Sequence, residues 1–114
     1  MIEKTILDYL NSAELLPARA YTEMPKTPPS KLYLIEKTGD SQTNHVNTAT
    51  VAIQSYGGSL YEASSLNEEL KGAMMNGLIR LDGISGVKLN YDYNFTDTTT
   101  KRYRYQAVFL VTYY

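Results

Sequence analysis

The stretch VKLNYDYNFTDTTTKRYRYQAVFLV, residues 87–111, alternates apolar and polar side chains on both sides of a polar turn. Such alternation is typical of strands with one buried face, and the central TDTTT segment predicts a hairpin turn. Both apolar sets fall on odd-numbered positions, so one antiparallel register would bury all of them on the same face. That register pairs Phe95 with Tyr103, Tyr93 with Tyr105 and Leu89 with Phe109. A slip of one residue would expose the whole set, so the pattern favours this register.

A helix is predicted immediately before this hairpin. Ser59 and Glu62 stand in the S-x-x-E relation of a capping box, in which each side chain binds the other residue's backbone N–H. We expect the helix to run from Ser59 to about Leu81, with Gly83 ending it. One stripe at three- and four-residue steps predicts its buried face: Leu60, Ala63, Asn67, Leu70, Met74, Leu78 and Leu81.

The first half of the chain predicts a shorter helix followed by strands. Apolar residues at helical spacing indicate a helix over residues 2–13, which Pro17 would stop. Residues 18–23 suit a short strand, and two strands are predicted over residues 32–37 and 48–56. The polar segment Gly39–Asn47 lies between those two strands, and we expect it to be the mobile tip of a long hairpin.

This order of elements predicts an α+β protein: an antiparallel sheet of four or five strands with two helices packed on it. The 114 residues (12.9 kDa) suit a single domain covering residues 1–114. The opening segment has no signal-peptide pattern and the longest apolar run, Ala107–Val111, is too short to span a membrane. We therefore expect synthesis in the cytoplasm and no membrane partner.

Composition disfavours most enzyme chemistries. The chain has no cysteine and one histidine, which removes thiol catalysis, cysteine-based zinc sites and histidine clusters. His45 lies in the polar hairpin tip without a partner placed by any motif, and Glu62, Glu68 and Glu69 form no paired-carboxylate site. The Gly57-Gly58-Ser59 turn lacks the lysine or third glycine of nucleotide-binding motifs. We predict no catalytic, cofactor-binding or metal-binding residue, and no cofactor.

Nucleic-acid binding is a second possibility from the sequence alone. Lys101, Arg102 and Arg104 interleave with Tyr103 and Tyr105, and aromatic and basic side chains on a sheet bind single strands in some proteins. However, the alternation places both tyrosines on the core face, and the net charge of −1 lacks the basic excess typical of such proteins. Eleven tyrosines instead favour a protein that assembles, because tyrosine is enriched at interfaces.

The block VAIQSYGGSLYEASSLNEELKGAM, residues 51–74, resembles the small tail-completion proteins of long-tailed phages. These are tail terminator and tail-to-head joining proteins, often described as minor capsid proteins of phages and prophages of Gram-positive bacteria. The resemblance rests on the strand ending Ile53–Tyr56, the Ser59–Glu62 helix start and Leu66–Glu68, with a looser likeness over the whole chain. Related folds also serve as head-completion and neck proteins.

The resemblance implies a tail-terminator-like fold and a structural protein of the virion, located at the head–tail junction. Such subunits form a ring, typically hexameric, that caps the tail tube, faces the head connector and lets duplex DNA pass without sequence-specific binding. The implied partners are further copies of the chain, the tail tube protein and the head-completion or connector protein. An α+β nucleic-acid-binding module, another neck protein and an enzyme of unrecognised type stay open as alternatives.

Two groups of residues are predicted to make the contacts of such a ring. Val108 and Leu110 replace charges on the polar face of the last strand, which suggests that another element or subunit covers that face. The candidate subunit interface comprises Glu68, Glu69, Lys71, Val108, Leu110, Tyr113 and Tyr114. The candidate docking or channel loop comprises Asp40, Gln42, Asn44, His45 and Asn47.

Overall fold

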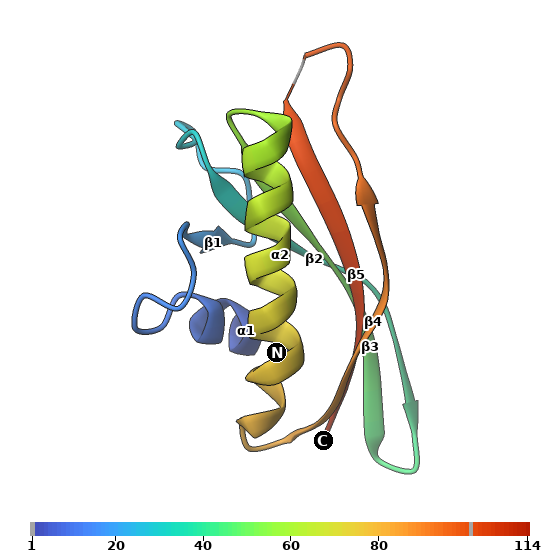
Figure 1. The fold of residues 1–114 in the computed structure, drawn as a ribbon. Coiled ribbons are helices and arrows are strands. Elements are labelled where there is room, and N and C mark those ends of the chain that lie inside the picture. Colours follow the sequence, from blue (N-terminus) through green and yellow to red (C-terminus); the bar gives the residue numbers. More distant parts are fainter. Residues whose placement is uncertain (1, 101) are drawn as a thin grey trace.

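A computed structural model describes residues 2–100 and 102–114 of the chain (Figure 1). The elements in this part are, in order, α1 (Ile2–Leu10), β1 (Ala20–Tyr21), β2 (Leu32–Thr43), β3 (Val46–Gly57), α2 (Leu60–Asn76), a 3-10 helix (Leu78–Arg80), β4 (Ile84–Asn94) and β5 (Tyr103–Tyr113). The strands form one five-stranded sheet in the order β1-β2-β3-β5-β4. The prediction of an α+β fold with two helices and up to five strands is confirmed.

The sheet is mixed, because β1 runs parallel to β2 while the other neighbouring strands are antiparallel. The prediction of a purely antiparallel sheet is therefore wrong. The cause lies in Asn11, whose side chain accepts a hydrogen bond from the Ala20 N–H at 2.8 Å and donates one to the Ala20 carbonyl at 3.0 Å. These two bonds hold β1 against the end of α1, in line with β2.

The helix α1 ends at Leu10, before the predicted end at residue 13 and well before Pro17. The chain reverses in the next four residues, where Ala13 and Glu14 adopt positive φ angles of 43° and 54°. A residue with a positive φ angle cannot continue a right-handed helix. The helix thus ends where Asn11 forms its hydrogen bonds to β1, six residues before Pro17.

The start of α2 follows the predicted cap with one difference. The Ser59 hydroxyl accepts a hydrogen bond from the Glu62 N–H at 3.1 Å, as a capping box requires. The Glu62 carboxylate, however, accepts from the Gly58 N–H at 2.7 Å and not from that of Ser59. Gly57 permits the sharp entry from β3, since a Cβ there would lie 2.7 Å from the Ala63 nitrogen.

The end of α2 comes at Asn76, earlier than the predicted Leu81. The Tyr9 hydroxyl of α1 donates to the Ala73 carbonyl at 2.8 Å and lies against Gly77, where any Cβ would overlap it. Gly77 separates α2 from the 3-10 helix that follows. The contact between the two helices therefore decides where α2 stops.

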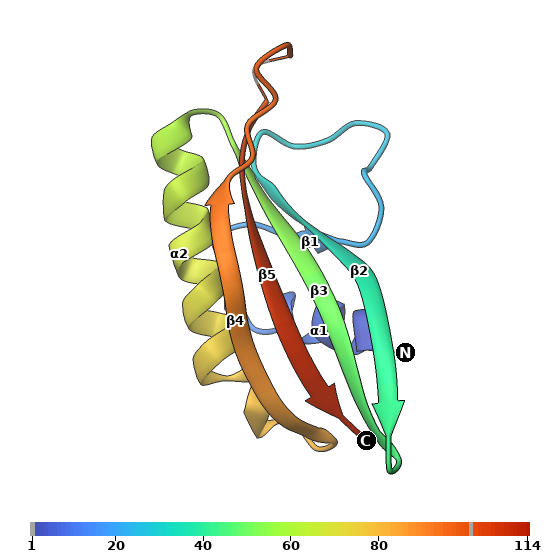
Figure 2. The same cartoon turned by 90° about the vertical axis from the view of Figure 1, so that its right-hand side faces the viewer.

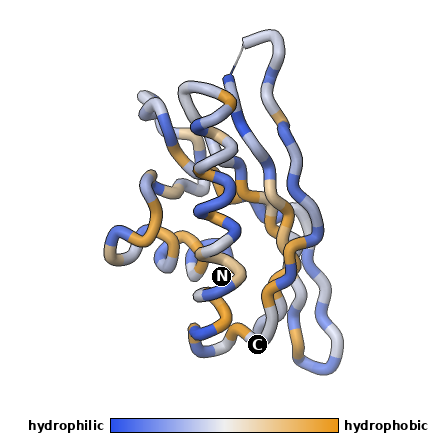
Figure 3. The backbone as a smooth tube through the Cα atoms, viewed as in Figure 1, coloured by the Kyte–Doolittle hydropathy of each residue, from blue (hydrophilic) through white to orange (hydrophobic). Residues whose placement is uncertain are grey.

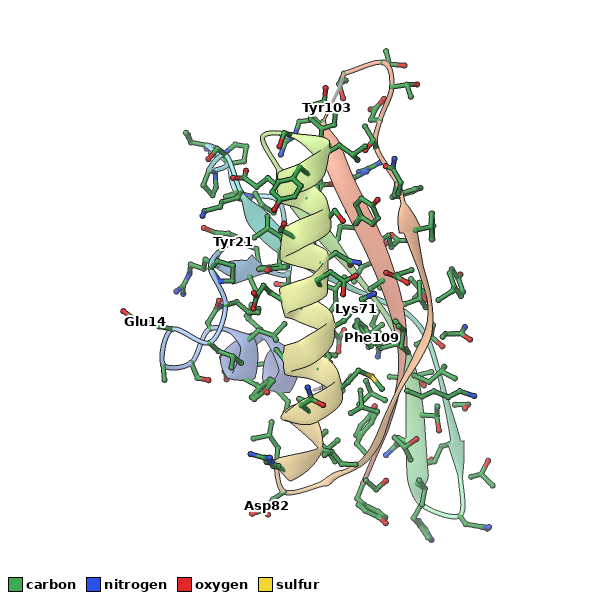
Figure 4. All side chains as sticks on the ribbon, viewed as in Figure 1. Glu14, Tyr21, Lys71, Asp82, Tyr103 and Phe109 are labelled. Carbon is green, nitrogen blue, oxygen red and sulfur yellow. The ribbon has the colours of Figure 1, made fainter. Side chains whose placement is uncertain are left out.

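Both helices lie on the same side of the sheet (Figures 1 and 2). The core forms between them and the sheet, where Tyr33, Val51, Ile53 and Phe109 are fully buried. Figure 4 shows Phe109 between β5 and α2. The predicted stripe of α2 is buried at Ala63, Asn67, Leu70, Met74 and Leu78, whereas Leu60 is exposed and Leu66 is buried in addition.

The segment Gly39–Asn47 is strand for most of its length. The β2–β3 ladder continues to the pair Thr43 and Val46, so only Asn44 and His45 form the turn. Their φ angles of 52° and 67° are the positive values that a two-residue type I′ hairpin turn requires. The predicted long hairpin is confirmed, but its tip is a tight turn and not a nine-residue loop. Figure 3 shows this projecting end in mostly neutral and hydrophilic colours.

The β4–β5 hairpin contains an extra residue that the alternation did not reveal. Leu89 pairs with Phe109 as predicted, but the next paired residue of β4, Tyr91, lies opposite Val108, which makes Asn90 a β-bulge. Tyr93 consequently pairs with Gln106 instead of Tyr105. The predicted register is wrong beyond the bulge, and this part of β4 turns its odd-numbered side chains away from the helices.

Alkaline pH is expected to destabilise the fold through Tyr33. Its hydroxyl donates to the Leu66 carbonyl at 2.8 Å, and burial, followed by the charge of Glu69, raises its pKa well above the usual value of 10.0. In the unfolded chain Tyr33 loses its proton above about pH 10, whereas the folded protein keeps it, so stability falls as pH rises. We predict that Tyr33→Phe flattens this fall in urea unfolding midpoints measured from about pH 7 to about pH 11.

Tyr61→Phe serves as the matched control, because the Tyr61 side chain is 82% exposed. It should leave the slope of midpoint against pH unchanged. Equal slopes for Tyr33→Phe and the unsubstituted protein would contradict the prediction.

Candidate interaction surface

Both helices pack on one face of the sheet and leave the other face without a helix. We call this second face the open face, and Figure 2 shows it toward the viewer. Because β5 alternates, Ala107 and Phe109 face the core, and Arg104, Gln106 and Val108 face outward. Beyond the Asn90 bulge, the outward residues of β4 are aromatic. They are Tyr91 and Tyr93, and Phe95 follows just after the strand ends; 53%, 37% and 36% of their surfaces are exposed.

These rings pack against one another. Tyr91 and Tyr93 are stacked with centroids 5.8 Å apart, and Tyr93 meets Phe95 edge to face at 5.5 Å. Aromatic pairs at such distances attract beyond the area that they bury. The rings therefore form a pre-packed ridge along the edge strand.

Two arginines continue the ridge across β5 to β3. The guanidinium carbon of Arg104 lies 4.4 Å from the Phe95 ring centroid and 5.6 Å from that of Tyr56, and that of Arg102 lies 4.9 Å from the Tyr56 ring. Arg104 also donates to the Phe95 carbonyl at 2.7 Å and to the Tyr56 hydroxyl at 2.8 Å. We call the set Tyr91, Tyr93, Phe95, Arg104, Tyr56 and Arg102 the aromatic–arginine ladder.

Amides beside the ladder fix its hydroxyl groups. Gln106 donates to the Tyr93 hydroxyl at 2.7 Å, and Gln54 donates to the Gln106 side-chain oxygen at 2.9 Å. The Tyr56 hydroxyl in turn donates to the Gln54 side-chain oxygen at 2.9 Å. The ladder is thus held in place by hydrogen bonds as well as by ring contacts, which lowers the entropy lost on binding a partner.

The ladder carries positive charge. In residues 2–100 and 102–114, neither Arg102 nor Arg104 forms an ion pair with a carboxylate. Asp97 lies in the adjoining turn, where its pKa is lowered chiefly by the Thr99 N–H that binds it and to a small extent by Arg104. Lys101, part of the predicted basic cluster, lies outside the described residues.

The same bulge turns Asp92 toward α2. Its carboxylate accepts hydrogen bonds from the Asn67 amide at 2.8 Å and from Lys71 at 3.0 Å. Lys71 lies on the side of α2 that faces β4 and β5 (Figure 4), and it also binds Glu68 at 3.0 Å. Glu68, then Asp92, raise the pKa of Lys71 above its usual value. This cluster joins the edge strand to the helix layer.

The predicted subunit-interface residues do not form one surface. Glu68 and Glu69 are exposed on α2, while Lys71 is engaged inside the protein. Val108 is buried and Leu110 half-buried on the open face. Tyr113 packs against the core from the opposite face of β5, and the neighbouring Tyr114 is exposed. The structure therefore brings these residues to three places.

The predicted docking residues lie together on the projecting β2–β3 hairpin. Asn44 and His45 form its turn, and Gln42 pairs with Asn47 in the ladder behind it. Asp40 is farther from the tip and forms an exposed ion pair with Lys37 at 3.0 Å. All five residues thus share this hairpin, where they lie on paired strands and a two-residue turn and not on a long loop.

Residues 2–100 and 102–114 place no three Asp, Glu or His side chains together as a metal site. No helix within the described chain is long and apolar enough to cross a membrane. A comparison with protein-family models finds no match, and a search of curated proteins finds none either. The likeness to tail-completion proteins therefore stays a prediction.

Sequence reasoning missed Tyr91, Tyr93 and Phe95 as surface groups. It placed these three residues in the core because their odd numbers match that of Phe109. The alternation predicts that Asp92 and Asn94, at even positions, face solvent. In the structure Asp92 instead faces α2 and accepts a hydrogen bond from Asn67. The available signal was Asn67, a polar residue in the otherwise apolar stripe of α2, which needs a polar partner from the sheet. Asp92 could have been proposed as that partner, and Tyr91 and Tyr93 would then face outward.

We predict that Asp92→Ala destabilises the protein by about 1–3 kcal/mol, because it leaves the buried Asn67 amide without an acceptor. Asn67 is 1% exposed, and its Oδ1 already has no partner within the described chain. Denaturant unfolding at neutral pH measures the change. The control Asp40→Ala removes only an exposed ion pair and should alter stability little. Equal effects of the two substitutions would contradict a structural role for the Asp92 cluster.

Proposed function

We propose that this chain is a structural, self-assembling protein that completes a phage tail. Copies of it form a ring, hexameric in the simplest case, that caps the tail tube and joins it to the head connector while DNA passes through. The proposal combines the resemblance of residues 51–74 to tail-completion proteins with the surface described above. A tail-terminator-like arrangement of the α+β fold, and a place at the head–tail junction, are parts of the same proposal.

The observation that carries the proposal is the aromatic–arginine ladder, in which Tyr91, Tyr93 and Phe95 are exposed and Tyr56 is buried. Tyrosine, phenylalanine and arginine are the residue types enriched where proteins bind each other, and a cluster of them is typical of an interface centre. Its rings are ordered by mutual packing, so a partner would meet a rigid surface. The near-neutral net charge of −1 suits a conduit, since a strongly basic ring would hold DNA instead of letting it slide.

The ladder is less suited to single-stranded nucleic acid, the main alternative function. Such proteins stack bases on free aromatic faces. Here Tyr93 lies between Tyr91 and Phe95, and Arg104 lies over the Phe95 ring. Neighbouring rings and the Arg104 guanidinium thus occupy ring faces of Tyr93 and Phe95 that bases would need, which favours a protein partner.

Light scattering after size exclusion, at several concentrations and with purified uncapped tail tubes, tests the function. We expect a discrete ring in solution, or a monomer that assembles on tube ends. Tubes from completed particles, whose ends are already occupied, provide the control and should bind none. A protein that ignores uncapped tubes at every concentration would contradict the tail-completion function.

A shortened hairpin tests the docking role of the β2–β3 tip. Removing the pairs Gln42–Asn47 and Thr43–Val46 while keeping Asn44 and His45 lets Ser41 and Thr48 close the same turn. Because the core residues remain, we expect a folded protein that still binds tubes but no longer joins them to heads. Particles assembled in vitro and counted by infectivity measure the joining step; full infectivity would show that the tip is not needed.

A further inference from the structure

The outward face of α2 has features that the fold itself does not require. Tyr61, Ser65, Glu68, Gly72 and Met75 follow one another at four- and three-residue steps, which places them on one side of the helix. This side points away from the sheet, and Tyr61 and Met75 are exposed there. Two large apolar side chains therefore flank a stretch of small and acidic ones.

Gly72 is the clearest of these features. Glycine is the poorest helix former after proline, yet Gly72 lies in the interior of α2. A Cβ built at this position meets nothing within 4 Å, so no contact within the described chain explains the glycine. Gly57 and Gly77, by contrast, are each required by a close neighbour. An approach of another molecule to the helix backbone gives Gly72 a physical reason.

A groove runs beside Gly72. It has a volume of about 490 Å³ and lies between α2 and the segment after α1, with Leu15 on one wall and Glu68 and Glu69 along α2. Arg80 contributes one positive charge farther along. Lys71 forms an ion pair with Glu68 at 3.0 Å from the β4 side of α2, whereas Glu69 forms no ion pair within the described residues.

The open face has the opposite charge. Arg102 and Arg104 belong to the ladder, and Lys88, opposite Leu110, shares their face. Two acidic residues accompany these three cations: Glu36 on β2, opposite Ala52, and Asp97, which forms a β-bridge with Arg102. Charges of opposite sign on two surfaces of one chain favour contact between copies.

We infer that the open face of one subunit packs on the outward face of α2 in the next, with Arg102 beside Glu68 and Glu69 and the aromatic ridge over Gly72. The contact rests on the proposed self-assembly and specifies how it occurs. Since the two surfaces lie on opposite sides of each subunit, every added copy leaves one of each free. Such a head-to-tail contact closes into a ring when its rotation permits.

Two other arrangements of copies are disfavoured. Two open faces packed on each other would bring Arg102 and Arg104 of both copies together, and like charges in an interface oppose binding. Pairing between sheet edges would use β4 and the part of β2 that β1 leaves unpaired, but β4 carries bulges at Ser85 and Asn90 and β2 an irregularity at Thr38. Bulges of this kind are how sheet edges avoid pairing with other strands.

Single substitutions on each surface provide the first test. Gly72→Gln fills the groove, and Arg102→Glu reverses a charge that makes no hydrogen bond in the described chain. Each should weaken self-association roughly tenfold or more in sedimentation velocity, without lowering the melting temperature. Gly39→Gln is the matched control, since Gly39 also has nothing within 4 Å, and it should associate like the unsubstituted protein.

Mixing the two variants is the decisive experiment. Gly72→Gln retains an intact open face and Arg102→Glu retains an intact α2 surface, so together they should form a dimer with one copy of each and nothing larger. Combining Arg102→Glu with Glu69→Arg in one chain should restore association. A mixture that stays monomeric, or a Gly72→Gln protein that assembles normally, would overturn the inferred contact.

The outcomes separate this contact from the proposed function. Association through these surfaces without binding to tail tubes would uphold the contact and contradict tail completion. If Gly72→Gln still caps tail tubes, the result would support tail completion and contradict the inferred contact. Binding of a labelled single-stranded oligonucleotide that Arg102→Glu abolishes and Gly72→Gln does not would assign the open face to nucleic acid and overturn the contact.

Discussion

The hydrogen bonds from Asn67 and Lys71 to Asp92 fix the orientation of the outer half of β4, and the open face depends on them. In a strand, neighbouring side chains point to opposite faces, so a carboxylate that faces α2 forces Tyr91 and Tyr93 to face away. The bulge at Asn90 supplies the extra residue that makes this change of face compatible with Leu89 in the core. One polar contact beneath the sheet thereby determines the aromatic surface above it.

The helix α2 consequently has two distinct sides. Its inward side contributes Leu70 and Met74 to the core and Asn67 to the Asp92 cluster, which holds the edge strand. Its outward side, with Gly72 at its centre, contributes nothing to the core. The sheet also has two sides: one contributes to the core, and the other is the open face. The subunit is therefore a two-layer body with different chemistry on its two outer surfaces, as a directional assembly requires.

Much of the architecture was predictable because local patterns and tertiary packing agree. The alternation in β5, the cap at Ser59 and the buried stripe of α2 all gave elements that the structure contains. Other features depend on contacts between distant residues, which a local pattern does not contain. Asn11 places β1 parallel to β2, and Tyr9 ends α2 at Gly77. The polar stretch after Lys37 continues as strand in β2, but both of its faces are exposed to solvent. Its composition therefore resembles that of a loop.

The candidate site was less predictable than the fold for a related reason. A bulge adds one residue without a glycine or proline to mark it, and the pattern of odd-numbered aromatics in β4 and β5 continues unbroken across Asn90. Sequence reasoning identified Arg102, Arg104, Glu68 and Glu69 individually, but it could not show that Arg104 lies over Phe95, at the end of the row of rings that Tyr91 and Tyr93 begin. That association depends on the register of two strands, which only the three-dimensional pairing reveals.

The position of β5 between β3 and β4 has a consequence for the folding rate. β3 cannot complete its pairing until β5 arrives, and the intervening chain contains all of α2 and β4. Closing so long a loop costs conformational entropy before the central ladder forms, and sheets with such non-local pairing fold slowly. The β4–β5 hairpin is local in sequence, but Tyr56 on β3 meets Arg102 and Arg104 only when β3 and β5 pair. The ladder is therefore incomplete in any species that has not yet closed the central pair of strands.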